Sequence, residues 1–378
     1  MRPRLVSALA GIAGLALAAS PLAVPAQAAE GQPARTAAAP AGKQAGEQAG
    51  KQAGRRVGSR EVAFEVSNAN TTTALCSSDG EAYELRGRLV GPRRALSGAS
   101  PVLRVNVLVH DAGTGAWFWN LRQAPGVDYA RHLARRGETS LVLDRLGYDR
   151  SPLADGTATC LGAQASMLHQ VIQHLYAGLY RFTDGGAGAG RPPHATHVVV
   201  HGHGTGATVA QLEAAEFDDV AGLVLMSAPT ATPTTEALAV VTEQLGRCLG
   251  GDGYSAYGAT AAEYRSLLFA SASERVRRLA TARRNPTPCG DVSSLLAGVG
   301  TATLTARAVE APVLALSGAR DARVRPLGQS AAESLFARSE RVTARTFAGA
   351  GSALPLEARA GRVRSAVLAF LADVRPSL

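Results

Sequence analysis

The chain has almost no lysine, few aromatic side chains and no long apolar run beyond its first 30 residues. Only Lys43 and Lys51 are lysines, so nearly all the basic charge behind the net +9 comes from arginine. The arginines are dispersed, and aromatic residues make up only 5% of the chain. The sequence therefore lacks the basic, aromatic-rich surface that is typical of nucleic-acid-binding proteins, and we expect no nucleic-acid partner.

The first 60 residues have hardly any large apolar side chains outside one N-terminal run. Two arginines precede an apolar segment at 5–24, and an Ala-Gln-Ala sequence follows it. This pattern predicts a secretory signal peptide over 1–28, with a retained membrane anchor as the alternative. Residues 29–60 repeat Gly, Gln and Ala and predict a disordered linker. We expect one domain over 61–378, secreted or extracytoplasmic, with no membrane span after cleavage.

The chain has no Cys-x-x-Cys pair, which argues against a structural zinc site. Its four cysteines are an even number, and in an exported protein this predicts two disulfides with three possible pairings. We favour Cys248–Cys289 and Cys76–Cys160. Four histidines lie between 194 and 203, but His201 and His203 flank a sharp turn and no carboxylate partner is evident. We therefore predict no metal site and no cofactor.

Apolar periodicity predicts strands that alternate with helices. The expected strands are residues 62–66, 82–90, 102–109, 139–143, 197–201, 220–226, 312–316 and 341–347. The expected helices are residues 129–136, 164–180, 205–215, 331–338 and 361–374. This alternation predicts an α/β fold with a mostly parallel central sheet and helices on both faces.

Several segments carry a resemblance to a known family. Gly202-His203-Gly204-Thr205-Gly206 follows a valine-rich strand and resembles the nucleophile elbow, G-x-S-x-G, of α/β-hydrolases. VNVLVHDAGTGAWFW resembles the oxyanion loop of that superfamily, LVLDRLGYDRSP its next strand, and VLALSGARDARVRP the strand that delivers the acid. The set is similar to a group of secreted bacterial and fungal hydrolases. The resemblance implies an α/β-hydrolase fold from Val102 onward, with a helical cap insertion over 230–305.

The same resemblance shows what the catalytic triad lacks. Gly204 stands at the position of the serine nucleophile, Asp321 at that of the acid, and Ser352 at that of the histidine. None of the eight histidines follows Asp321, so a small shift in alignment cannot restore the triad. The backbone N–H groups of Ala112 and Thr205 are the expected oxyanion-type donors.

Asp111 replaces the glycine that usually follows the histidine of the oxyanion loop. A carboxylate there would oppose a developing oxyanion. We expect it to serve instead as a general base whose pKa is raised by burial. The alternative is that Asp111 points to solvent or pairs with an arginine. Asp321 keeps its position as a catalytic candidate, or persists only as a loop anchor.

Aromatic and imidazole side chains near these loops are the expected pocket for a small-molecule ligand or substrate, apolar or aromatic in character. They are His110, Trp117, Trp119, Tyr148 and His203. Ordinary packing between cap and core is the alternative for the aromatic residues, and a structural, hydrogen-bonded role is the alternative for His203.

Three functions remain open at this stage. The first is a cofactor-free, non-hydrolytic enzyme, such as a carbon–carbon bond former, lyase or isomerase of natural-product chemistry that stabilises an anion. The second is a catalytically inactive pseudohydrolase that binds a small molecule or a partner. The third is an esterase- or lipase-like hydrolase with a displaced nucleophile. The fold cannot separate them, because function depends on the site.

Overall fold

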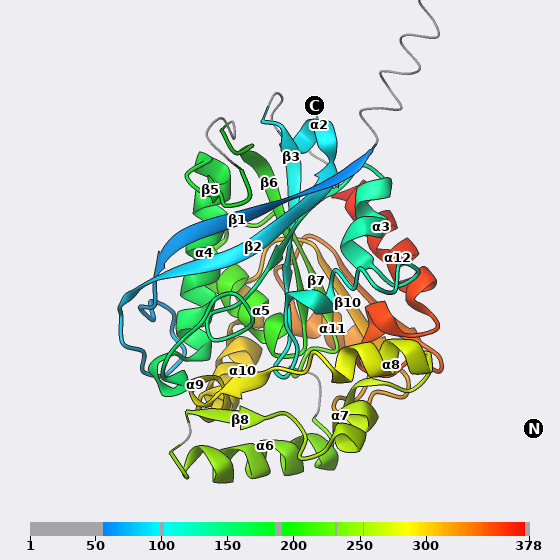
Figure 1. The fold of residues 1–378 in the computed structure, drawn as a ribbon. Coiled ribbons are helices and arrows are strands. Elements are labelled where there is room, and N and C mark those ends of the chain that lie inside the picture. The colour runs from blue at the N-terminus through cyan, green and yellow to red at the C-terminus, as the bar shows by residue number, and fades with distance from the viewer. Residues whose placement is uncertain (1–55, 99–101, 186–190, 231–232, 252, 375–378) are drawn as a thin grey trace, which may run out of the picture. The chain divides into compact units, whose positions relative to one another are not determined.

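A computed structural model describes residues 56–98, 102–185, 191–230, 233–251 and 253–374 (Figure 1). The predicted signal peptide and most of the predicted linker lie outside these residues. Within the described helices, none is long and apolar enough to cross a bilayer.

A central sheet of nine strands organises the part of the chain that the structure describes. Its strand order is β11-β10-β7-β6-β3-β4-β2-β1-β5, and it is parallel from β11 to β4. The strands are β1 (Val57–Ser67), β2 (Ala82–Pro92), β3 (Val102–Val109), β4 (Thr139–Leu143), β5 (Arg181–Phe182), β6 (Ala195–His203), β7 (Gly222–Met226), β10 (Val313–Gly318) and β11 (Val342–Phe347). The mostly parallel sheet predicted from the sequence is confirmed.

The alternation of side chains along each strand builds a separate hydrophobic core on each face of the sheet. On β3, Val105, Val107 and Val109 enter one core, whereas Leu108 enters the other. Helices α4 (Leu161–Ala177) and α5 (Thr205–Phe217) cover the first face, and α3 (Tyr129–Arg135) and α12 (Ala360–Asp373) cover the second. Two further helices are α2 (Arg93–Leu96) and α11 (Gln329–Leu335). Helices therefore lie on both faces, as expected.

The N-terminal edge of the sheet is antiparallel and starts earlier than predicted. Residues 57–60, assigned to the linker by their composition, belong to β1 and pair with residues 89–92 of β2. The pairing partners, which lie 29 to 35 residues further along the chain, supply the order that the local sequence does not indicate. Residues 57–60 therefore belong to the sheet and not to the linker.

The segment predicted as the cap forms its own set of helices between β7 and β10. It contains α6 (Thr235–Cys248), β8 (Tyr254–Ala256), α7 (Ala261–Leu268), α8 (Glu274–Thr281), β9 (Pro286–Pro288), α9 (Cys289–Ser293) and α10 (Leu295–Thr305). Figure 1 shows α6, α7 and α8 together at the end of the sheet opposite α2. Cys248 and Cys289 form a disulfide that joins α6 to α9, as the sequence predicted.

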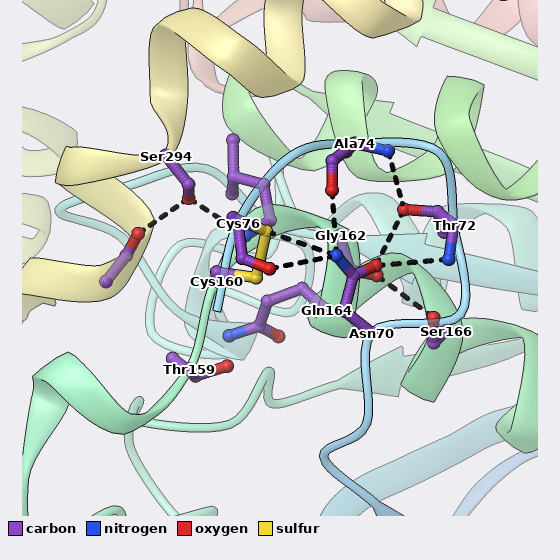
Figure 2. The surroundings of a disulfide bond; sticks show 12 residues. Asn70, Thr72, Ala74, Cys76, Thr159, Cys160, Gly162, Gln164, Ser166 and Ser294 are labelled. Atoms are coloured by element: carbon purple, nitrogen blue, oxygen red, sulfur yellow. Dashed lines mark hydrogen bonds between the residues drawn. A yellow bond between two sulfur atoms is a disulfide. The ribbon is translucent and has the colours of Figure 1, made fainter. Parts of the chain in front are cut away.

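The second predicted disulfide, Cys76–Cys160, ties the loop after β1 to the start of α4. Figure 2 shows the side chain of Asn70 beside it, where its amide donates to the carbonyls of Ala74, at 2.8 Å, and Cys76, at 3.2 Å. On the other side, the N–H of Leu161 in the first turn of α4 donates to a serine hydroxyl of the cap, that of Ser294, at 3.0 Å. The disulfide therefore holds the loop against α4, the Asn70 bonds brace the loop internally, and the Ser294 bond ties the cap to the same helix.

Candidate functional site

The turn from β6 into α5 has the backbone of a nucleophile elbow without its side chain. Gly204 has φ 53° and ψ −122°, a conformation that costs most residues energy but not glycine. Its N–H donates to the carbonyl of Met226 at 3.0 Å. A Cβ at Gly206 would overlap carbonyl oxygens at the end of β3, so the close approach of α5 to that strand also requires glycine.

Two backbone N–H groups converge beside Gly204, and both donate to the same carboxylate oxygen. The N–H groups of Ala112 and Thr205 lie 2.8 and 2.7 Å from Oδ1 of Asp111. A Cβ built on Gly204 would overlap this carboxylate. The side chain of Asp111 thus fills the space in which a nucleophile would stand and uses both of the expected oxyanion donors.

Arg323 pairs with the second oxygen of Asp111. Its guanidinium donates to Oδ2 of Asp111, to the hydroxyl of Tyr257 at 2.8 Å, and to the hydroxyl of Ser352. The ion pair is buried, with the two side chains 8% and 1% exposed. Arg323 therefore bridges Ser352 and the carboxylate that lies against Gly204.

The electrostatics of Asp111 differ from the expectation of a general base. Burial does act to raise its pKa, but the charge of Arg323, the neighbouring His203 and the N–H of Thr205 outweigh burial and hold that pKa at about 2. A carboxylate with so low a pKa accepts protons poorly at neutral pH. The expectation of a raised pKa is corrected, and the alternative of an arginine pair describes the geometry.

His203 lies under the ion pair as a buried, hydrogen-bonded side chain. Its Nε2 donates to the carbonyl of Ser352 at 3.0 Å, and its ring stacks on Phe118 with centroids 4.4 Å apart. Its Nδ1 lies 3.6 Å from Oδ2 of Asp111. Burial lowers the pKa of His203 to about 4, although Asp111 acts to raise it, so the ring is neutral at pH 7.

Asp321 and Ser352, which the sequence analysis assigned to the acid and histidine positions, both lie beside Arg323. Oδ1 of Asp321 accepts the N–H groups of Arg323, at 2.9 Å, and Val324, at 3.3 Å. Burial raises the pKa of Asp321. The carbonyl of Ser352 accepts the hydroxyl of Ser227 at 3.0 Å as well as the imidazole of His203. Asp321 therefore positions the backbone of Arg323, whereas Ser352 contacts the guanidinium directly through its hydroxyl.

A cavity of about 100 Å³ opens above the ion pair and is roofed by the cap. Asp111, Thr205 and Arg323 form part of its floor, together with Asp291 from α9. Most of the wall is aliphatic and comes from α6, α9, α10 and the loops after β7 and β10. These residues are Pro229, Pro233, Ala237, Leu238, Val240, Val241, Val292, Leu295, Leu296, Val299 and Val324.

None of the five residues expected in the pocket lines this cavity, and these expectations are corrected. Trp119 is fully buried against Phe118 and Tyr129 in the sheet core, because its segment turns away from the cap. Trp117 lines a separate surface hollow beside Asp144.

The other three are beneath the cavity and bonded within the protein. His110 donates through Nδ1 to the carbonyl of Asp111 and accepts the N–H of Arg145 at Nε2. Tyr148 donates to Oδ2 of Asp291, which is also paired with Arg145. His203 is covered by Asp111 as described above. The aromatic residues of the expected pocket are thus packed within the protein, and the histidines have structural hydrogen bonds, as in the alternative stated above.

The sequence analysis missed Arg323 and the aliphatic faces of α6 and α10. A signal for Arg323 was present, because a buried aspartate needs a cation and three arginines follow β10 at 320, 323 and 325. Tyr257 comes from the cap and packs on Gly113, which has φ 65°. Its position depends on how the cap folds over the sheet, which no local pattern indicates.

Known proteins share this architecture. Structures similar to the chain include a thermophilic esterase from Thermogutta terrifontis, with 22% identity and a TM-score of 0.56, covering 83% of this chain and 100% of that one. A putative lipase from Acinetobacter baumannii has 15% identity and a TM-score of 0.53, covering 90% of this chain and 99% of its own. A peroxisomal alpha-beta-hydrolase from Saccharomyces cerevisiae has 15% identity and a TM-score of 0.53, covering 85% of this chain and 91% of its own.

These identities establish the fold and not the reaction. A search of curated protein sequences gave no match. A family model described as the alpha/beta hydrolase family matches residues 107–366, which span both the elbow and the cap. With more than half of its length matched and the sheet and elbow in place, the chain belongs to the alpha/beta hydrolase family.

Proposed function

We propose that this protein is a non-hydrolytic member of its family that binds an apolar small molecule between cap and sheet. The observation that carries the proposal is the position of the Asp111 carboxylate. It accepts both N–H groups at the elbow and is paired with Arg323. Ester hydrolysis needs a nucleophile next to a base and a free oxyanion hole, and here the protein itself fills both places.

The cavity supports a ligand that is mainly aliphatic. Its wall is built from leucine, valine, alanine and proline side chains. At about 100 Å³ it is smaller than the cavity of about 150 Å³ that takes up benzene in an engineered protein core. Leu238 and Leu296 belong to the same wall yet are 48% and 63% exposed. They give a longer ligand an apolar path toward solvent.

Two measurements on the purified protein test this function. A fluorescent apolar probe, 1-anilinonaphthalene-8-sulfonate, should bind saturably and be displaced by straight-chain alcohols or fatty acids. A fluorophosphonate reagent should label no serine, and p-nitrophenyl esters should not be turned over. Stoichiometric labelling of a serine would refute the non-hydrolytic assignment, and a probe that no apolar competitor displaces would refute the binding function.

A pair of variants on α10 locates the binding. Val299 lines the cavity, whereas Leu304 on the same helix is 76% exposed and is not among the lining residues. Val299→Glu places a charge against the ligand and should weaken binding at least about tenfold, because burying an unpaired charge is costly. Leu304→Glu is the matched control and should leave the affinity unchanged. Equal effects of the two substitutions on the affinity would argue against this cavity as the binding site.

The non-hydrolytic enzyme expected from the sequence is the second candidate. It is favoured by the two converging N–H groups, which would stabilise an anion if the Asp111 carboxylate moved away, and by Nδ1 of His203, which has no hydrogen-bond partner among the described residues. The low pKa of Asp111 opposes a role as the base. Recovery of the bound ligand as a chemically altered product would favour this candidate, and recovery unchanged would favour binding alone.

We also propose that the protein works outside the cytoplasm. The N-terminal sequence has the pattern of an export signal, and the two disulfides are of the kind that persists in oxidising compartments. N-terminal sequencing of protein from culture medium should begin near residue 29.

A further inference from the structure

Away from the cap, three ionisable side chains from two helices and a loop come together. His169 lies on α4, Glu213 on α5, and Asp219 on the loop that leads from α5 to β7. Their candidate ligand atoms all lie within 4.8 Å of one another. The helices are packed side by side in the same core (Figure 1). The cluster thus brings one imidazole and two carboxylates to a single place.

Glu213 is the unusual member of this cluster. Its side chain is completely buried, and neither carboxylate oxygen has a hydrogen-bond partner in the described part of the chain. A buried carboxylate without a partner is strongly disfavoured in its charged form. It therefore needs either a bound proton or a cation, and its position facing His169 and Asp219 is where a cation would sit.

The distances fit a small divalent ion. Nδ1 of His169 lies 2.9 Å from Oδ2 of Asp219 and 3.8 Å from Oε1 of Glu213. Two ligands about 2.0–2.1 Å from a tetrahedral Zn²⁺ lie roughly 3.3 Å apart. The contact between Nδ1 of His169 and Oδ2 of Asp219 is short but does not have the geometry of a hydrogen bond. Nδ1 of His169 has no hydrogen-bond partner in the described chain. Such an arrangement is expected when ligand atoms face a common centre.

Neighbouring groups hold two of the three side chains in place. The amide of Gln173, one turn along α4 from His169, donates to Oδ2 of Asp219 at 2.6 Å. The ring of Phe217 stacks on that of His169 with centroids 3.9 Å apart. Side chains oriented by hydrogen bonds and packing are typical of metal ligands.

We propose that His169, Glu213 and Asp219 bind one divalent transition-metal ion, with zinc the best match, and that solvent completes its coordination. One imidazole with two carboxylates suits Zn²⁺ better than Ca²⁺, which takes six to eight oxygen ligands. The side chains of His169 and Asp219 are 27% and 15% exposed, so the cluster lies close to the surface, with its candidate ligand atoms buried. The ion would clamp α5, the helix that begins at the elbow, to α4.

The metal-free alternative is a proton shared between the two carboxyl groups. Burial, and then the neighbouring Asp219, raise the pKa of Glu213 well above its usual range, which favours such a proton when no cation is present. The two states differ in their response to added zinc, which makes them separable.

Thermal unfolding of the purified, chelator-treated chain with and without zinc tests the site. Zinc at about a hundred times its Kd should raise the unfolding midpoint by about 5 °C, with one ion bound per chain by calorimetry, and excess chelator should reverse the rise. Glu213→Gln keeps the shape but removes a ligand, and it should abolish the zinc-dependent rise. Asp219→Asn should do the same and serves if the first variant does not fold.

Asp218→Asn is the matched control. Asp218 is exposed, adjacent to Asp219 and outside the cluster, and its φ of 48° is one that asparagine adopts readily. This variant should keep the full zinc-dependent rise. Failure of zinc to shift wild-type unfolding would assign the cluster to the shared proton and overturn the metal site. An equal shift in Glu213→Gln or Asp219→Asn would also overturn it, because zinc would then be bound elsewhere.

Discussion

At the elbow, one carboxylate and one guanidinium form a buried pair beside Gly204. Asp111 takes up both backbone donors, and Arg323 neutralises the charge that this creates in a buried place. Removing one member of such a pair leaves the other as an uncompensated buried charge, which costs far more than the pair itself contributes. The stability of the site thus depends on keeping both residues or neither.

Arg323→Met tests this dependence. Methionine keeps much of the aliphatic volume but leaves the Asp111 carboxylate without its cation. We expect the free energy of unfolding at pH 7 to fall by about 3–5 kcal/mol. Urea denaturation monitored by fluorescence measures the loss. The double variant Asp111→Asn/Arg323→Met should cost less than the sum of the two single variants, and strictly additive costs would contradict the coupling.

Gly204→Ala tests the space that the carboxylate occupies. The positive φ alone makes alanine unfavourable, and the added Cβ would overlap the fixed Asp111 side chain. We expect a loss of roughly 3 kcal/mol or more in unfolding free energy. Combining it with Asp111→Gly removes the overlap and should recover part of the loss. A Gly204→Ala protein as stable as wild type would mean that the carboxylate lies elsewhere.

How far the site could be predicted depended on sequence separation. The elbow, with Gly204, Thr205 and the neighbouring Ala112, follows from short motifs that fix a local backbone. The pairing of Asp111 with Arg323 joins residues 212 positions apart, and no periodic pattern connects them. Trp119 was predicted in the pocket because of its nearness in sequence to the oxyanion loop, whereas its side chain turns into the sheet core.

Among the larger elements, the strands and core helices were predicted one by one, whereas the cap was predicted only as a helical insertion with its disulfide. The strands have a period of two and the helices one of 3.6, so a single stretch of sequence contains the signal. Even there the ends differ: α4 stops at Ala177 because Gly178 takes φ 66° and closes the helix, three residues before the predicted end at 180. The cap helices are short, and their arrangement depends on contacts with the sheet.

The cap helix α6 is held mainly at its two ends. Only Val240 and Gln244 are buried along it. At its start, the N–H of Thr234 donates to the carbonyl of Arg323 at 2.9 Å, and at its end Cys248 is bonded to Cys289. Because so little of α6 is buried, we expect its order to depend on the disulfide more than that of the core helices does.

Replacing that disulfide should loosen the roof of the cavity. A disulfide spanning 41 residues contributes about 4 kcal/mol by the loop-entropy estimate. In Cys248→Ser/Cys289→Ser, amide hydrogen exchange should accelerate in α6 before it does in α5, and affinity for the apolar probe should fall several-fold. Cys76→Ser/Cys160→Ser is the comparison, since neither cysteine lines the cavity. Unchanged exchange in α6 would show that its other contacts suffice.

Across the whole molecule, buried titratable groups of opposite sign set the response to pH. Burial lowers the pKa of His110 and His201 to about 3 and that of His203 to about 4. Each histidine is therefore neutral when folded but takes up a proton below about pH 6.5 when unfolded. Burial raises the pKa of Asp144 to about 7 against the charge of Arg150. Its effect on the pH dependence is opposite to that of the histidines.

The sign for each group follows from proton binding. A histidine whose pKa is lowered in the folded state contributes its full stability above about pH 6.5, the pKa of the unfolded state. That contribution is lost progressively as the pH falls from about 6.5 to the pKa of the folded state. An aspartic acid with a raised folded pKa contributes stability that is full below about pH 3.8 and is lost as pH rises to about 7. Where these two pH ranges overlap, each histidine or aspartic acid of this kind changes the slope of the free energy of unfolding against pH by about 1.4 kcal/mol per pH unit.

Two single variants should therefore change the pH dependence in opposite directions. His201, which contacts the hydroxyl of Tyr129 and the amide of Asn106, is removed as a titrating group in His201→Gln. Between pH 6 and 4.5, the slope of unfolding free energy against pH should fall by about 1.4 kcal/mol per unit. Asp144→Asn removes the opposing group and should steepen the same slope by a similar amount. Urea denaturation at four pH values measures both slopes. Parallel curves for the wild type and His201→Gln would mean that this imidazole is charged in the folded protein, contrary to its burial.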